Sequence, residues 1–261
     1  MLTSPFTILY HHRELLVAWT MRVIRARYQQ SLLGGLWAIV QPVATVAIFT
    51  TVFSIILKVE TGNIPYVIFA YSALVPWMLF SSSIIDMSES IVTNMNLIGK
   101  IYFPRDILVI AALLARLMDF LIAYTLLILL MTYFKIPIFQ ITWLFLPVLL
   151  LVQLSLALGL GLILAALNAF YRDIKHLVTL VLQLWLYATP IIYPVDRVPE
   201  AVRPFYFLNP MAGVIEGYRA VMIHGRLPDA NLLISALTAL IILIIGYWVF
   251  KRVEQRFADI I

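Results

Sequence analysis

Long apolar runs alternate with short polar segments along this chain. The runs cover residues 31–57, 61–85, 107–133, 136–171, 177–195 and 230–250. Only the third run contains charged residues, Arg116 and Asp119. A hydrocarbon core of roughly 30 Å requires about 20 apolar residues in a helix. The pattern therefore predicts an all-α polytopic membrane protein with six transmembrane helices, five within residues 31–193 and the sixth over residues 231–250.

Composition supports this class and excludes several kinds of site. Hydrophobic residues make up 63% of the chain and charged residues 12%, with no cysteine and 4 histidines, which largely excludes disulfides, thiol nucleophiles and Cys/His metal sites. The net charge of +5 does not indicate nucleic-acid binding, because the basic residues flank the apolar runs. Outside the runs, 11 lysines and arginines lie on the side of the N-terminus and 6 on the opposite side, which predicts that both termini are cytoplasmic.

The first 30 residues carry a different pattern. Leu16, Trp19 and Val23 share one helical face, whereas Arg22 and Arg25 lie on the other. This predicts an amphipathic helix over residues 1–30 that lies at the membrane interface against lipid. A solvated helical leader is the alternative.

No internal repeat divides the chain, so residues 1–261 are expected to form a single domain. The fourth apolar run has small residues at every fourth position, a spacing that allows two transmembrane helices to approach closely, within a protomer or between protomers. These residues are Ala157, Gly161, Ala165 and Ala169.

Catalytic motifs are absent from the sequence, which has no phosphate loop, dinucleotide fingerprint or His-Glu-x-x-His pair. Counting 1.5 Å per residue from Tyr133 places Asp119 roughly 21 Å below the outer membrane boundary. Unpaired charge at that depth costs several kcal/mol, so a structural ion cluster is expected, with a substrate or proton site as the alternative. The cluster would comprise Asp86, Glu89, Arg116 and Asp119.

The segment between the second and third runs, residues 94–106, is unusually apolar for a loop. A simple chain reversal has little use for Ile101, Tyr102 and Phe103. Exposed apolar side chains indicate docking to a partner protein, and an interfacial helix lying against lipid is the alternative.

Several motifs together resemble those of a known family. The sequence from Gly34 to Pro42, with Trp37 and Gln41 inside it, resembles the G-x-x-W-x-x-x-Q-P signature of type-2 ABC export permeases, specifically the polysaccharide branch that moves O-antigen, capsule and teichoic-acid polymers. Further blocks agree in order: Val75-Pro76-Trp77, residues 97–105, Tyr171-Arg172-Asp173-Ile174, Pro190-Ile191-Ile192-Tyr193 and Leu208-Asn209-Pro210-Met211. One departure is Tyr171, where the family pattern has phenylalanine.

The resemblance implies an ATP-powered exporter in the bacterial cytoplasmic (inner) membrane, in which this chain is the permease and not an enzyme. A separate nucleotide-binding subunit would use ATP and Mg²⁺, so no cofactor is expected in this chain. Two permease copies would assemble with two ATPase copies. The loop would then act as a coupling helix that contacts the ATPase. Its contact residues would be Asn96, Lys100, Ile101, Tyr102, Phe103 and Arg105.

Aromatic and polar residues recur every four positions in the first and fifth runs. Aromatic faces stack on the C–H faces of sugar rings without selecting a hydroxyl pattern, so a polymer can slide past them. The resemblance implies that these two spans line a passage between the protomers, whereas lipid-facing or interfacial anchoring is the alternative. The candidate pathway residues are Trp37, Gln41, Phe49, Phe53, Trp185, Thr189 and Tyr193.

Five prolines punctuate residues 194–230. The short apolar pieces 202–208 and 211–222 predict two re-entrant or interfacial helices between spans five and six. Irregular backbone at membrane depth must be covered by protein or water, so the segment is expected to form an outer gate that includes Asn209, Glu216 and Arg219. A cap that only stabilises the dimer is the alternative.

The expected function is export of a lipid-linked polysaccharide from the cytoplasmic side of the membrane. A drug or small-lipid exporter of the same permease class is the alternative within transport. A membrane-embedded enzyme or assembly scaffold is a more distant alternative from a different class.

Overall fold

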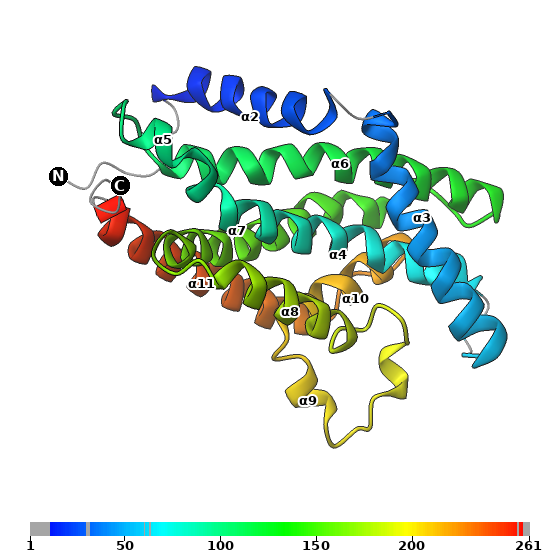
Figure 1. Cartoon of the computed structure of the whole chain (residues 1–261). Coiled ribbons are helices and arrows are strands. Elements are labelled where there is room, and N and C mark those ends of the chain that lie inside the picture. The colour runs from blue at the N-terminus through cyan, green and yellow to red at the C-terminus, as the bar shows by residue number, and fades with distance from the viewer. Residues whose placement is uncertain (1–10, 30–31, 60, 63, 255, 258–261) are drawn as a thin grey trace.

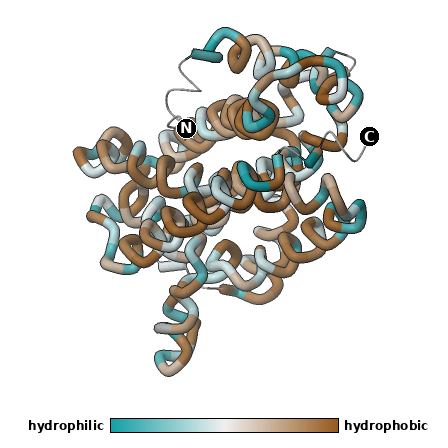
Figure 2. Tube along the Cα trace, turned by 90° about the vertical axis from the view of Figure 1, so that its left-hand side faces the viewer, coloured by the Kyte–Doolittle hydropathy of each residue, from teal (hydrophilic) through white to brown (hydrophobic). Residues whose placement is uncertain are grey.

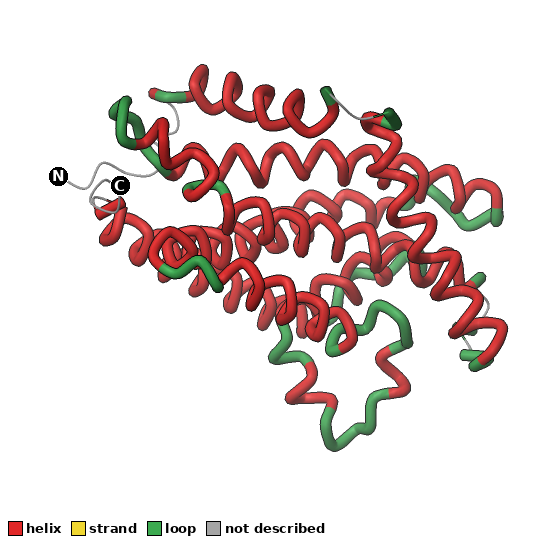
Figure 3. The backbone as a smooth tube through the Cα atoms, viewed as in Figure 1, coloured by secondary structure: helices red, strands yellow, loops and turns green. Residues whose placement is uncertain are grey.

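The computed structural model describes residues 11–29, 32–59, 61–62, 64–254 and 256–257, and every regular element within these ranges is a helix (Figures 1 and 3). The longer helices are α2 (Arg13–Tyr28), α3 (Trp37–Phe49), α4 (Tyr66–Glu89), α6 (Asp106–Tyr133), α7 (Leu146–Phe170), α8 (Ile174–Tyr187), α10 (Pro210–Met222) and α11 (Asn231–Val253). The shorter ones are η1 (Gly34–Leu36), η2 (Thr50–Ile56), η3 (Val92–Asn94), α5 (Met95–Ile98), η4 (Ile141–Phe145), η5 (Val195–Arg197) and α9 (Arg203–Tyr206).

Five of these helical stretches are long and apolar enough to cross a membrane: Gly34–Ile56, Tyr66–Glu89, Asp106–Tyr133, Ile141–Phe170 and Asn231–Val253. Figure 2 shows hydrophobic residues dominating the bundle, with hydrophilic residues more frequent along α2 at the top. The predicted all-helical, multi-pass architecture is therefore confirmed. The predicted count of six full-length helices is corrected to five plus one shorter apolar helix, α8.

α8 is shorter than the predicted fifth span, residues 177–195. Its 14 residues extend only about 21 Å, less than the roughly 30 Å of a hydrocarbon core. Pro190 explains the early end, because proline has no amide N–H to continue the helix and disfavours helical backbone in the residue before it. The chain leaves the helix after Tyr187 and turns through residues 188–193.

α4 is the central helix of the bundle and packs against α3, α6, α7, α8 and α10. Two buried amides of α7 donate hydrogen bonds to its backbone. Gln153 Nε2 lies 2.8 Å from the carbonyl oxygen of Pro76, and Asn168 Nδ2 lies 2.9 Å from that of Ser88. A buried amide without a partner is costly, so these two bonds set the register of α7 against α4.

The small-residue stripe of α7 packs inside the protomer. Gly161 faces α4, where an added Cβ would lie 3.0 Å from the Cβ of Met87. The tightest approach between two backbones lies on another face of α7, between Gly159 and Gly246 of α11. A Cβ added to Gly159 would lie only 2.6 Å from the amide nitrogen of Leu243 in α11. Small residues therefore let α7 and α11 pack backbone to backbone.

The predicted N-terminal helix is present, and its position at the membrane surface stays a prediction. α2 covers Arg13–Tyr28, and the predicted part over residues 1–10 lies outside the described residues. α2 runs side by side with α6 (Figure 1). Ionic contacts at its C-terminal end, described below, hold it there.

The outer segment contains both predicted short helices. The one predicted over residues 211–222 is α10, which packs against α4, α7 and α11 and is buried except at Glu216. The other is reduced to the single turn of α9 within the long loop of Figure 3. α10 is thus part of the bundle and not a surface cap.

We predict that Gly246→Ala destabilises the protein. The new Cβ would overlap the carbonyl oxygen of Gly159, which is backbone and cannot move aside, and overpacking of this kind costs about 1–3 kcal/mol. Thermal unfolding of the purified protein in detergent should show a lower midpoint. Gly35→Ala is the matched control, because its Cβ would meet only Ile122 Cδ1 at 3.9 Å. An unchanged midpoint for Gly246→Ala would contradict close α7–α11 packing.

Candidate transport pathway and coupling surface

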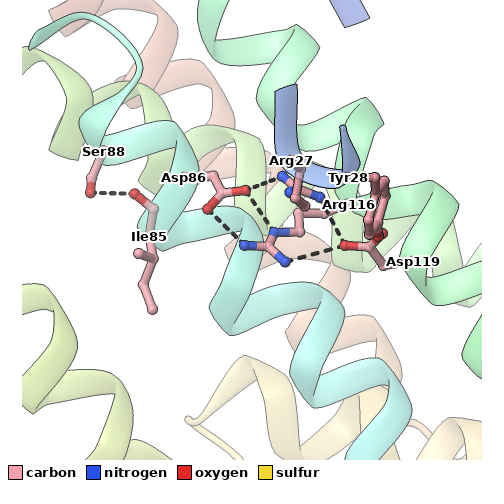
Figure 4. Close-up of polar contacts among 7 residues, drawn as sticks. All are labelled: Arg27, Tyr28, Ile85, Asp86, Ser88, Arg116 and Asp119. Carbon is pink, nitrogen blue, oxygen red and sulfur yellow. Dashed lines mark hydrogen bonds and ion pairs between the residues drawn. The ribbon is translucent and has the colours of Figure 1, made fainter. Parts of the chain in front are cut away.

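Two arginines and two aspartates from three helices form one ion cluster (Figure 4). Arg116 of α6 binds Asp86 of α4 through Nε and Nη2, at 2.6 and 2.9 Å, and Asp119 through Nη1 at 3.2 Å. Arg27 of α2 binds the same carboxylates, Asp86 at 2.5 Å and Asp119 at 2.8 Å. The four charges sum to zero, which lowers the cost of placing them in a half-buried environment.

Arg27 and Tyr28 are members of the cluster that sequence reasoning missed. Tyr28 donates its hydroxyl hydrogen to Asp119 Oδ1. Burial and this hydrogen bond raise the pKa of the Tyr28 hydroxyl to about 12, so it remains a donor at physiological pH. Glu89, which was expected in the cluster, forms no ion pair with any described residue.

A cavity of about 260 Å³ lies beside the cluster, between α2, α3, α4 and α6. It brings together the cluster and two of the predicted pathway residues. Trp37 is 45% exposed, and the side chain of Gln41 makes no hydrogen bond with any described residue. The polar and aromatic residues that line the cavity are Arg27, Tyr28, Trp37, Gln41, Ser82, Arg116, Asp119 and Phe120.

The other two predicted pathway residues of the first span lie further along it. Phe49 ends α3 and Phe53 lies in η2, and their rings meet edge to face with centroids 6.0 Å apart. Both are partly buried against the core. They do not line the cavity, so the structure divides the predicted α3 stripe into a cavity part and a distal part.

The predicted pathway residues of α8 are engaged inside the protomer. Trp185 packs edge-on against Phe80, with ring centroids 5.3 Å apart, and donates its indole N–H to Asn209 Oδ1 at 2.8 Å. Thr189 is 0% exposed and therefore does not face any passage in this protomer. Tyr193 shares a hydrogen bond of 3.1 Å with the hydroxyl of Tyr206.

Asn209 and Arg219, predicted in the outer gate, bind the turn that follows α8. Asn209 caps α10 through the amide of Met211 and donates from Nδ2 to Ala188 O at 3.1 Å and Thr189 Oγ1 at 2.9 Å. It therefore ties the end of α8 to the start of α10. All three of these hydrogen bonds lie at that junction.

Arg219 is only 1% exposed and is the largest of the described side chains that are less than 2% exposed. Its guanidinium donates to the carbonyl oxygens of Pro190 at 2.5 Å and Ile191 at 3.0 Å. Glu216 Oε1, 2.8 Å from Nη1, supplies the compensating charge, and the ring of Phe69 stacks on the guanidinium at 3.6 Å. Arg219 thus satisfies carbonyls that no helix pairs.

The loop predicted to couple to a partner divides into exposed and anchored residues. Asn96, Lys100 and Ile101 are exposed, and Tyr102 is 100% exposed. Phe103 turns inward and stacks on Trp19 of α2, with ring centroids 6.2 Å apart.

Arg105 of the loop is also anchored rather than free. Its backbone amide donates to Glu254 Oε1 at 3.1 Å, and its guanidinium donates to the Glu254 carbonyl oxygen. Lys251 of α11 pairs with the neighbouring Asp106 at 3.1 Å. The loop is therefore fixed to α2 on one side and to the end of α11 on the other, and only its tip projects.

Comparisons with known proteins agree with this multi-pass architecture. The family described as ABC-2 type transporter matches residues 14–223 of the chain. This chain belongs to the ABC-2 type transporter family. The O-antigen export system permease protein RfbA of Myxococcus xanthus is 32% identical over 255 residues, which are 96% of each chain. RfbA of Klebsiella pneumoniae is 30% identical over 95% of each chain, and the polysialic acid transport protein KpsM of Escherichia coli is 26% identical over 90% of this chain and 92% of its own.

Membership of the ABC-2 family makes this chain a membrane permease subunit of a transporter, with ATP hydrolysis on a partner ATPase subunit. The described residues contain no group of three or more histidine, aspartate or glutamate side chains that could hold a metal ion. The residues missed by sequence reasoning, Arg27, Tyr28 and Glu254, all flank the membrane spans. Arg27 and Glu254 were visible in the sequence only as charges at the ends of helices, and Tyr28 gave no such signal.

The ion cluster of this ABC-2 permease should behave as one charge-balanced unit. Arg116→Ala leaves two carboxylates with one arginine, and we expect a loss of about 1–3 kcal/mol, because the side chains are partly screened. Adding Asp119→Asn restores neutrality, so the double variant should lose less than the sum of the single variants. Thermal unfolding of the purified variants measures this.

Glu89→Gln is the control for that cycle, because it removes a carboxylate outside the cluster and should leave the unfolding midpoint unchanged. Strictly additive losses for Arg116→Ala and Asp119→Asn would mean that the charges act independently.

Arg219→Met should strongly impair folding, because the carbonyl oxygens of Pro190 and Ile191 lose their donor. Each unsatisfied buried acceptor costs about 1–3 kcal/mol. Arg219→Lys should retain part of the stability, since an ammonium group can donate but lacks the planar fork. The yield of monodisperse protein and its unfolding midpoint report the effect, with Arg197→Met as an exposed control. Normal values for Arg219→Met would rule out the clamp.

Proposed function

We propose that this chain is the permease subunit of an ATP-driven exporter that moves lipid-linked polysaccharide, O-antigen-like or a related cell-surface glycan, from the cytoplasmic side across the bacterial inner membrane. The observation that carries the proposal is the near end-to-end similarity to RfbA of Myxococcus xanthus, 32% identical over 96% of each chain. The similarity to the polysialic acid transport protein KpsM of Escherichia coli also supports the proposal.

We further propose six membrane crossings with both termini in the cytoplasm. Gly159 of α7 lies against Gly246 of α11, and Phe170 lies near Phe257, with ring centroids 5.9 Å apart. These contacts mean that α7 and α11 run in the same direction, so the chain must return across the bundle between them. α8 and the turn after it supply that crossing, which supports the even number.

The proposed assembly is a homodimer with two ATPase subunits at the cytoplasmic end. The exposed tip of the loop, residues 99–102, together with the exposed Asn96, is the proposed ATPase contact, because it presents a fully exposed aromatic side chain, Tyr102, next to Ile101 and Lys100. Aromatic side chains that fill a pocket on a partner often dominate binding energy. Phe103 and Arg105 act in this proposal as anchors that hold the tip in place.

The proposed cargo path follows α3, from Trp37 and Gln41 at the cavity to Phe49 and Phe53, and passes between the protomers. Trp185, Thr189 and Tyr193 have a positioning role in this proposal, since their polar groups are bound within the protomer. Asn209, Glu216 and Arg219 shape the outer end of the path by holding the turn after α8.

Deleting the gene should abolish surface glycan and cause polymer to accumulate in the cytoplasm, as detected by immunoblotting of cell fractions. The wild-type chain should restore export, and Tyr102→Ala should restore it poorly. Loss of an aromatic anchor of about 2 kcal/mol corresponds to roughly 30-fold weaker binding. Co-purification of the ATPase subunit should fall accordingly.

Tyr133→Ala is the matched control, because Tyr133 is an exposed tyrosine at the other end of α6. It should bind the ATPase and export polymer as the wild type does. Normal surface glycan in the deletion strain would overturn the proposed function, whereas normal ATPase binding by Tyr102→Ala would overturn only the coupling surface.

A further inference from the structure

The cavity between α2, α3, α4 and α6 contains polar groups that the fold itself does not use. Gln41 and Ser82 line the cavity, and neither side chain forms a hydrogen bond with any described residue. Both lie on helices long enough to span the membrane. A free amide on such a helix is unfavourable unless water or a ligand pairs with it, so these two groups point to an occupant that forms hydrogen bonds.

The ion cluster leaves further donors at the cavity wall. A guanidinium has five N–H groups, and the interactions described above engage two of those on Arg27 and three of those on Arg116. Arg27 and Arg116 both line the cavity. Together with Gln41 and Ser82, they offer several donors and acceptors within one partly open cavity.

The charges that line the cavity indicate which class of ligand it can bind. Arg27 and Arg116 are balanced by Asp86 and Asp119, so the site has no net charge with which to attract a phosphate or a cation. An anion would have to compete with carboxylates already bound at 2.5–3.2 Å. A neutral polyhydroxyl ligand can instead accept the spare donors without breaking any ion pair.

Size and shape narrow the class further. The volume of about 260 Å³ equals that of roughly nine water molecules in the liquid, which suits a single sugar ring and is too small for several. Trp37 is the exposed aromatic side chain of the wall. An indole face against the C–H face of a ring, with polar groups around the ring edge, matches the two chemically different surfaces of a pyranose.

We propose that this cavity is a binding site for one neutral sugar residue of the exported polymer, present in each protomer on the α2 side of the path. Trp37 stacks on the ring, and Gln41, Ser82 and the spare N–H groups of Arg27 bind its hydroxyls. The ion cluster is then a wall of the binding site as well as a structural element. This inference rests on the proposed function, because it takes the ligand from the polymer that the chain exports.

Site-specific photo-crosslinking in cells that make the polymer tests the site with the natural cargo. Benzoylphenylalanine is introduced at Gln41 in the full chain, co-expressed with its ATPase subunit, and adducts are detected with an antibody to the surface glycan. We expect glycan adducts at position 41. Ser82→Ala in the same background should lower the adduct yield about five- to tenfold, the effect of losing one hydrogen bond, and Trp37→Phe should lower it less because an aromatic face remains.

Val43 provides the control position. It lies two residues further along α3, on the opposite side of the helix, and does not line the cavity. Equal glycan adducts at positions 41 and 43, or adducts at position 41 that contain lipid without glycan, would overturn the sugar site.

Crosslinking at Phe53 separates failure of this inference from failure of the proposed function. Glycan adducts at position 53 without adducts at position 41 would overturn the cavity site and leave polymer export standing. If no position gives glycan adducts and the deletion strain shows normal surface glycan, both fall together.

Discussion

The fold of this permease depends on satisfying backbone carbonyls where the chain leaves helical structure at the end of α8. Pro190 forbids a longer helix, so the carbonyl groups of Pro190 and Ile191 have no helical partner. Arg219 supplies donors to both, and Tyr66 supplies one to Ile192 at 2.8 Å. Burying a guanidinium is itself expensive, but the cost is offset because a single planar group satisfies several acceptors and keeps its charge beside Glu216. This clamp and the hydrogen bonds of Asn209 together fix α8 relative to α10.

A second constraint acts at the opposite side of the bundle, where charge neutrality holds α2 against α4 and α6. Arg116 alone would leave Asp86 and Asp119 with one negative charge in excess, in side chains only 16–22% exposed. Arg27 removes the excess and in doing so brings α2 alongside α6. The same residues then enclose the cavity next to Trp37 and Gln41. The side chains of the ion cluster therefore hold α2 in place and also form part of the wall of the proposed sugar site.

The separation along the chain between interacting residues determines which features of the fold and the site the sequence could predict. Hydropathy alone locates the spans, because each needs only a local apolar run, and the i,i+3 contact of Glu216 with Arg219 is likewise local. The predicted fifth span included Pro190, because the residues around it are apolar. In the structure, α8 ends three residues before Pro190. The sequence did not predict Arg27 in the ion cluster, because its partner Asp86 is 59 residues away. Long-range pairing of this kind leaves no periodic signal in a single sequence.

The proposed coupling loop, residues 94–106, is anchored at its C-terminal end to α2 and to the end of α11. Phe103 contacts Trp19 of α2, and Arg105 contacts Glu254 beyond α11. A displacement of the loop by the ATPase would therefore act on α2 through an apolar stack and on α11 through ionic contacts. α11 is packed backbone to backbone on α7 and resists sliding, whereas α2 has no fully buried side chain and is held mainly by the ion cluster at its far end. The softer of the two connections is thus the one that leads to the cavity, which makes α2 the element through which motion at the loop would reach the cargo.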